Sequence, residues 1–167
     1  MNGFHYRPGP QSTKPEFFKG FPPNATVQQN LVWDTLMFES FANELDKVTG
    51  STPYRLPPSD VPLAGAGKFQ NRNIELTRTG TVERNRQRLA VLHYDAFFNS
   101  FDLDLPGGMK MVGRSDYWGD IWVVPATRAV ERATLNEEVV GLVHIPSQNS
   151  PERVNVVRRG SFEHIVR

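Results

Sequence analysis

The stretch at residues 26–49, TVQQNLVWDTLMFESFANELDKVT, has the clearest periodicity in the chain. At about 100° per residue, its apolar side chains fall within a stripe about 120° wide, which is typical of an amphipathic helix. Asn24 or Thr26 can cap the start of this helix, and Gly50 can end it before Pro53. The sequence therefore predicts one long helix whose core-facing stripe consists of Val27, Leu31, Phe38, Phe41, Ala42, Leu45 and Val48.

Two features of this helix go beyond simple amphipathicity. Val32, Trp33 and Leu36 lie off the main stripe, so the first half of the helix needs cover on a second face. Asp34 lies inside the stripe, close to the helix start, where the helix dipole favours a carboxylate. We interpret Asp34 as an acid satisfied by local donors, and the alternative is a catalytic acid whose pKa is raised by burial.

Composition indicates one folded domain with a net charge close to zero. The chain has 167 residues, 38% of them hydrophobic and 22% charged, which is enough to bury a core. The formal net charge of +1 gives no general attraction to nucleic acid or to an anionic membrane. No apolar run reaches the ~20 residues of a membrane helix, and no signal peptide is apparent. We expect a soluble protein, located in a virion or in the cytoplasm.

Residues 1–25 precede the helix and are rich in proline and glycine, which predicts an extended arm. This arm also carries several aromatic rings, and disordered segments are usually depleted in them. Two interpretations remain open: a tail that wraps its own domain, and an arm that docks on a neighbouring subunit. The rings that would form the second kind of contact are Phe4, Tyr6, Phe17, Phe18 and Phe21 of the arm, with Trp33 of the helix.

The chain after the helix is predicted to be mainly strands. Residues 52–67 are irregular and proline-rich, and residues 73–78 alternate like a strand that Thr79 and Gly80 can turn. Residues 89–98 fit either a strand or the end of a helix that would begin at Thr81, and apolar bulk on both faces favours the strand. Residues 101–112 predict a hairpin that turns at residues 106–108, with Lys110 across from two aspartates.

The last third of the chain completes the predicted architecture. We expect a strand at 117–124, a short helix at 127–138, and an antiparallel pair at 139–145 and 153–158. The fold class is thus α+β: one long N-terminal amphipathic helix on a mainly antiparallel β-sheet or roll, preceded by an extended Pro-rich arm. Residues 1–25 form the arm, and residues 26–167 form a single α+β domain.

Chemical motifs are sparse. There is no cysteine, which excludes disulfides, thiol nucleophiles and cysteine-bound zinc. His93 and Asp95 would share one strand face, and with Asp34 they could form an acid–base pocket under the helix. This arrangement of helix, sheet and His/Asp pair resembles the nuclear-transport-factor-2-like superfamily, whose members often place His and Asp in an apolar cavity. The resemblance implies a small-molecule enzyme or binder with an α+β roll.

A basic stretch offers a third possibility. Arg78, Arg84, Arg86 and Arg88 could contact phosphates, although a solvated strand face or an ion-paired subunit contact explains them better. The sequence favours a structural or interaction subunit of a large protein assembly that docks through its arm. The most concrete version is a virion component, such as a phage capsid-decorating, head-completion or tail protein. Its expected partners are other protein subunits in a homo- or hetero-oligomer, without membrane, nucleic acid, cofactor or metal.

Overall fold

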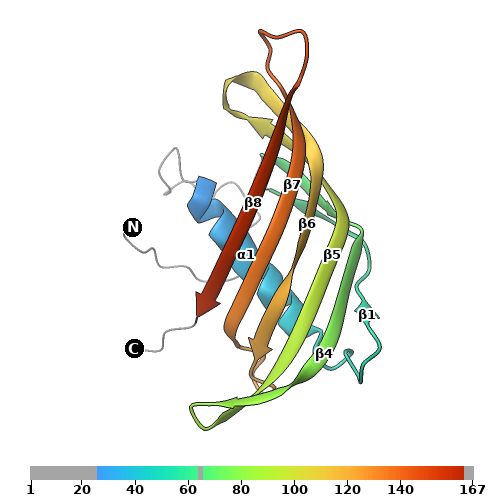
Figure 1. The fold of residues 1–167 in the computed structure, drawn as a ribbon, viewed down its shortest axis with the longest axis vertical. Coiled ribbons are helices and arrows are strands. Elements are labelled where there is room, and N and C mark those ends of the chain that lie inside the picture. The colour runs from blue at the N-terminus through green and yellow to red at the C-terminus, as the bar shows by residue number, and fades with distance from the viewer. Residues whose placement is uncertain (1–25, 64–65, 164–167) are drawn as a thin grey trace.

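A computed structural model describes residues 26–63 and 66–163, and for residues 26–29 it describes the backbone only. One antiparallel sheet curves around the α-helix α1 (Thr26–Asn43), so that the sheet has a concave face toward the helix and a convex face away from it (Figure 1). The strands are β1 (Tyr54–Arg55), β2 (Ser59–Pro62), β3 (Gly67–Asn71), β4 (Asn73–Arg84), β5 (Gln87–Leu105), β6 (Met109–Val123), β7 (Val130–His144) and β8 (Glu152–Glu163).

Each long strand pairs with the strand that follows it in the chain. The order across the sheet is β1-β4-β5-β6-β7-β8, and β3 pairs with the far end of β5 and with β2. The expected strand across residues 89–98 is confirmed within β5, and the hairpin at residues 101–112 is confirmed with its turn at Pro106–Gly108. Lys110 lies opposite Asp104, with 3.6 Å between the Nζ and Oδ1 atoms.

The core fills the space between α1 and the concave face. Phe38 and Phe41 of the helix pack against the ring of Tyr94 on β5, at centroid distances of 6.1 and 5.2 Å. Phe162 of β8 packs edge-on against Phe38 at 5.0 Å. Side chains alternate across a pleated strand, so every second residue of β6 and β7 reaches this core.

The predicted fold class was wrong in its proportions, because the described chain is mostly antiparallel sheet with one short α-helix. The helix ends at Asn43, not near residue 49. Beyond it, Leu45 N–H donates to Ala42 O at 3.2 Å in a tighter turn. Leu45 and Val48 remain buried in the core, because a tightened turn keeps them on the same side as Phe41. The helical spacing of apolar residues therefore continues in the sequence beyond the last residue of the α-helix.

Three further expectations were wrong. Residues 52–67 were expected to be irregular, but they contain β1, β2 and the first residue of β3. Residues 127–138 were expected to form a short helix, but β7 begins at Val130 and pairs on both sides, with β6 and β8. The turn expected at Thr79 and Gly80 is a β-bulge, and β4 continues to Arg84. The chain turns instead at Asn85 and Arg86, both with positive φ angles, of 50° and 61°. Among the described residues, no helix combines the length and the apolar character needed to span a bilayer.

Candidate interaction surface

The convex face carries an unusual backbone feature at Phe98. The pairing between β5 and β6 shifts register between Ala96 and Asn99, which makes a β-bulge. Phe98 in this bulge has a φ of 62°, in the left-handed region that a bulky residue rarely occupies. Its N–H donates to Asp116 Oδ1 at 2.6 Å. The residue is 64% exposed.

Asn99, the next residue, is fully buried and holds the bulge in place. Its Nδ2 donates to Ala96 O at 2.9 Å, and its Oδ1 accepts from the Arg72 N–H at 3.0 Å. Both interactions satisfy backbone groups that the interrupted ladder would otherwise leave unpaired. Specific hydrogen bonds therefore stabilise the bulge, and the bulge fixes the position of the Phe98 ring.

Exposed apolar side chains of neighbouring strands lie on the same face as Phe98. Val112 on β6 lies opposite Leu142 on β7, and Val140 lies two residues along β7, opposite Arg114. The Arg114 guanidinium lies over the Phe98 ring, 5.0 Å from its centroid. We call this surface the convex apolar patch, and its members are Phe98 (64% exposed), Val112 (37%), Val140 (45%), Leu142 (42%) and Val157 of β8 (64%).

A polar and aromatic cluster lies farther along the convex face. His93 and Asp95 are together there, as predicted from their spacing, with 3.4 Å between His93 Nε2 and Asp95 Oδ1. The other ring nitrogen of His93, Nδ1, is 2.9 Å from Asp120 Oδ1 on β6. Beside them, Trp118 packs near Phe97 at a centroid distance of 6.3 Å. All of these groups are at least partly exposed on an open sheet surface, not enclosed in a cavity.

Asp34, the third residue of the expected acid–base pocket, lies on the other side of the sheet. Its two oxygens accept from Nη1 and Nη2 of Arg158 on β8, each at 3.0 Å. Arg158 Nε also donates to Glu137 on β7, and Glu137 accepts from the Ser115 hydroxyl at 2.6 Å. Burial raises the pKa of Asp34, and the opposing effect of Arg158 only partly offsets this.

The donors to Asp34 are thus distant in sequence, not local as we expected. His93 sits between Leu92 and Tyr94, which both point into the core, so its ring points to the convex face. The sheet therefore separates Asp34 from His93 and Asp95. The three residues do not share one pocket.

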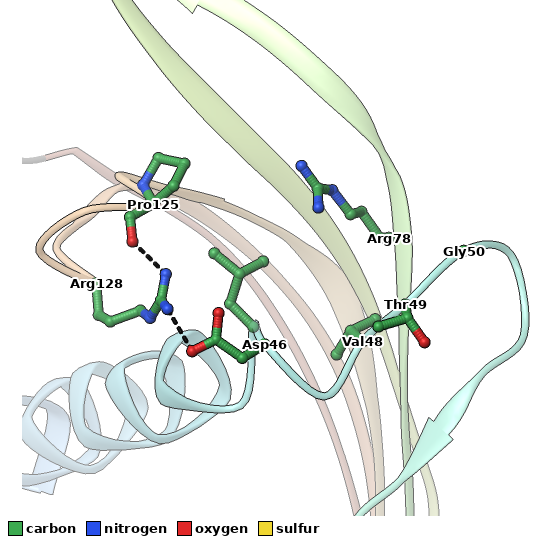
Figure 2. Close-up of a pocket in the computed structure, with 8 residues that line it drawn as sticks. Asp46, Val48, Thr49, Gly50, Arg78, Pro125 and Arg128 are labelled. Carbon is green, nitrogen blue, oxygen red and sulfur yellow. Dashed lines mark hydrogen bonds and ion pairs between the residues drawn. The ribbon is translucent and has the colours of Figure 1, made fainter.

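An open pocket of about 410 Å³ lies at the end of the helix, where the β6–β7 connection approaches β4 (Figure 2). Arg128 in this pocket forms an ion pair with Asp46 and donates to the Pro125 carbonyl. Arg78 lies on the opposite side of the pocket (Figure 2). Asp46 already pairs with Arg128, and the lining residues include no second carboxylate and no histidine. Among the described residues, no three His, Asp or Glu side chains are grouped to hold a metal ion.

The other predicted site residues have different outcomes. Phe4, Tyr6, Phe17, Phe18 and Phe21 lie outside the described residues, and Trp33 is half-buried on α1. The four arginines of the basic stretch lie along the β4–β5 hairpin, which extends past the ends of β6 and β7 (Figure 1). They are Arg78, Arg84, Arg86 and Arg88. Arg84 approaches Glu163 of β8, with 3.6 Å between Nη2 and Oε1.

Sequence reasoning missed Phe98 and the partners of Asp34. The available signal for Phe98 was two adjacent phenylalanines before an asparagine inside an alternating strand. In a regular strand, two adjacent phenylalanines point to opposite faces of the sheet, and at a β-bulge both can point to the same face. The periodicity of the sequence does not distinguish these two arrangements. Comparison of the chain with protein-family models, with curated proteins and with solved structures found no match.

Proposed function

We propose that this protein is a non-catalytic subunit of a larger protein assembly and that it docks on neighbouring subunits through the convex apolar patch. The most concrete version is a virion component: a capsid-decorating, head-completion or tail protein of a phage. The aromatic, proline-rich composition of residues 1–25 supports a second docking element of the same kind.

Phe98 is the observation that carries this proposal. A bulky residue in the left-handed region costs about 1–3 kcal/mol, and glycine would avoid that cost. The burial of a large ring usually offsets such strain, but this ring is mostly exposed. Within the described part of the chain, the hydrogen bond to Asp116 and the Arg114 guanidinium support this conformation, but no burial of the ring offsets its cost. A partner that covers the ring would supply this burial.

The surroundings of Phe98 have the composition of an interface centre. Aromatic rings and arginines dominate the binding energy of protein interfaces, particularly where neighbouring apolar contacts exclude water. Arg114 covers one side of the Phe98 ring, and Val140 and Leu142 extend the apolar surface along β7. These side chains stand on paired strands, not on a loop, so the surface is rigid before it binds.

The test is sedimentation of the chain with the particles of its source organism. We expect the wild-type chain to sediment with intact particles at a fixed copy number. Phe98→Ser and Leu142→Lys should each remove most of the bound chain, because they place a polar or charged group in the buried centre of the contact.

Val82→Lys is the matched control, because Val82 is also an exposed apolar strand residue (41%) but lies on the β4–β5 hairpin, away from the patch. It should leave sedimentation unchanged. Equal binding of all variants, or a wild-type chain that never sediments with a particle, would contradict the proposal.

A further inference from the structure

The two edges of the sheet differ in a way that points to a partner. At one edge, β1 has two residues, β2 has four, and prolines 53, 57, 58 and 62 flank or end them. Short strands and prolines are common devices that prevent another strand from adding to an edge. The other edge is β8, which has 12 residues, no proline and an uninterrupted register with β7.

Among the described residues, β8 pairs on one side only, which leaves a row of backbone donors and acceptors on its outer side. Val156, toward the concave face, and Val157, on the convex face, are 39% and 64% exposed. A strand that added here would pair the backbone groups and would cover apolar side chains on both faces.

We propose that the β8 edge pairs antiparallel with the β8 edge of a second copy of this chain, so that two sheets become one continuous sheet. This inference deepens the proposed function by naming one partner, and it uses a different surface from the Phe98 contact. A two-fold axis through such a pair runs perpendicular to the sheet. The concave faces of both copies then lie on the same side of the combined sheet. Directly opposed residues therefore come from the same face of each copy.

One register uses nearly the whole strand and places opposite charges and apolar side chains against each other near its ends. It is centred on Arg158 and places Arg153 opposite Glu163, Val154 opposite Phe162, and Asn155 opposite Ser161, each twice. Opposite charges and apolar pairs in these positions stabilise adjacent strands, and like charges destabilise them. The two Arg158 residues face each other at the centre, but Asp34 and Glu137 of the same copy already bind each guanidinium.

Neighbouring registers are poorer. A shift that centres the pair on Val157 places Glu152 opposite Phe162 and leaves Arg153 opposite Ser161. A shift that centres it on Val156 places Arg153 opposite Arg159, which sets like charges against each other. Of these three registers, only the one centred on Arg158 places Arg153 opposite a carboxylate.

Charge reversal tests this register. Arg153→Glu alone creates two acid–acid pairs across the contact, and Glu163→Arg alone creates two base–base pairs. Each variant should weaken the dimer about tenfold or more, because two facing pairs change from attraction to repulsion. An equal mixture of the two variants restores both pairs and should form mixed dimers with close to wild-type affinity. The readout is mass in solution across a concentration series, with circular dichroism to verify the fold.

Glu163 also contacts Arg84 and Arg132 within its own chain, so an independent measurement is needed. The chain has no cysteine, which makes introduced thiols unambiguous. A mixture of Asn155→Cys and Ser161→Cys copies should form a mixed disulfide under mild oxidation, because directly opposed strand residues lie within disulfide distance. Asn155→Cys mixed with Arg159→Cys tests the register centred on Val157 and should form far less.

A chain that stays monomeric at all concentrations, or mixed disulfides that form equally in both mixtures, would overturn the inference. The two proposals fail separately. A β8 dimer that never sediments with a particle would contradict the proposed function only. Loss of particle binding in Phe98→Ser without any effect of the β8 variants would contradict the β8 contact only.

Discussion

Asp34 on α1 and Arg158 on β8 form a two-point ion pair between residues 124 positions apart in sequence, with both contacts at 3.0 Å. The pair joins the first described element to the last one. It ties the helix to the edge strand of the sheet, on the side where the sheet remains open. Glu137 shares the same guanidinium, so one cation serves two buried carboxylates.

Loss of Arg158 should therefore be costly. Arg158→Leu leaves Asp34 and Glu137 buried without a cation, and breaking such a group typically costs about 3–5 kcal/mol. We expect the lower part of this range, because Arg158 itself is 30% exposed. Arg159→Leu is the matched control on the exposed convex side and should change the free energy of unfolding by about 0.5 kcal/mol or less. Urea unfolding measures both, and similar losses in both variants would contradict the prediction.

Alkaline pH should destabilise the protein through two buried tyrosines. Burial raises the pKa of both Tyr94 and Tyr117, whose hydroxyls donate to Thr134 O at 2.7 Å and to Asn71 Oδ1 at 2.8 Å. Above about pH 10 the unfolded state releases these protons and the folded state keeps them. The free energy of unfolding should therefore fall as pH rises, by about 1.4 kcal/mol per pH unit for each tyrosine.

The Tyr117→Phe variant should show about half of this slope, because one of the two phenols is gone. It should also lose about 1 kcal/mol at neutral pH with the hydrogen bond to Asn71. Phenolate absorbance follows the titration directly. Complete ionisation of every tyrosine in the folded protein near pH 10 would contradict the assignment.

Substitution by alanine should destabilise the protein at one glycine of the sheet and should have little effect at another. A Cβ at Gly119 would lie 2.1 Å from the Thr134 carbonyl oxygen and 2.9 Å from the Tyr94 hydroxyl oxygen, and at Gly80 it would meet nothing within 4 Å. Gly119→Ala should cost about 1–3 kcal/mol or more, because the strands must separate. Gly80→Ala should be close to neutral. A thermal scan compares them, and equal melting temperatures would argue against the close contact between β6 and β7.

Phe98 should show opposite effects on stability and on assembly. Phe98→Gly removes the cost of a bulky residue at positive φ, so the isolated chain should be as stable as the wild type or up to about 1 kcal/mol more stable. The same variant should bind the assembly less, because the ring is gone. Phe97→Leu is the neighbouring control without a positive φ. Clear destabilisation by Phe98→Gly would show that the ring stabilises its own chain.

Local patterns in the sequence determined which side chains face the core in the helix and where one hairpin turns. Phe38, Phe41, Leu45 and Val48 are buried, as their spacing predicts. The spacing of apolar residues indicates which side chains point to the core, even where the α-helix has ended. The turn at Pro106–Gly108 was visible because proline and glycine restrict or extend the backbone locally.

Only the tertiary structure decided the remainder, because it depends on contacts between distant segments. Residues 130–138 form a strand because β6 and β8 flank them, and their local pattern did not indicate this. The pairing of Asp34 with Arg158 needs the curvature that brings β8 to the helix. The exposure of Phe98 depends on a single bulge, and one inserted residue changes the facing of a strand without a clear trace in its composition.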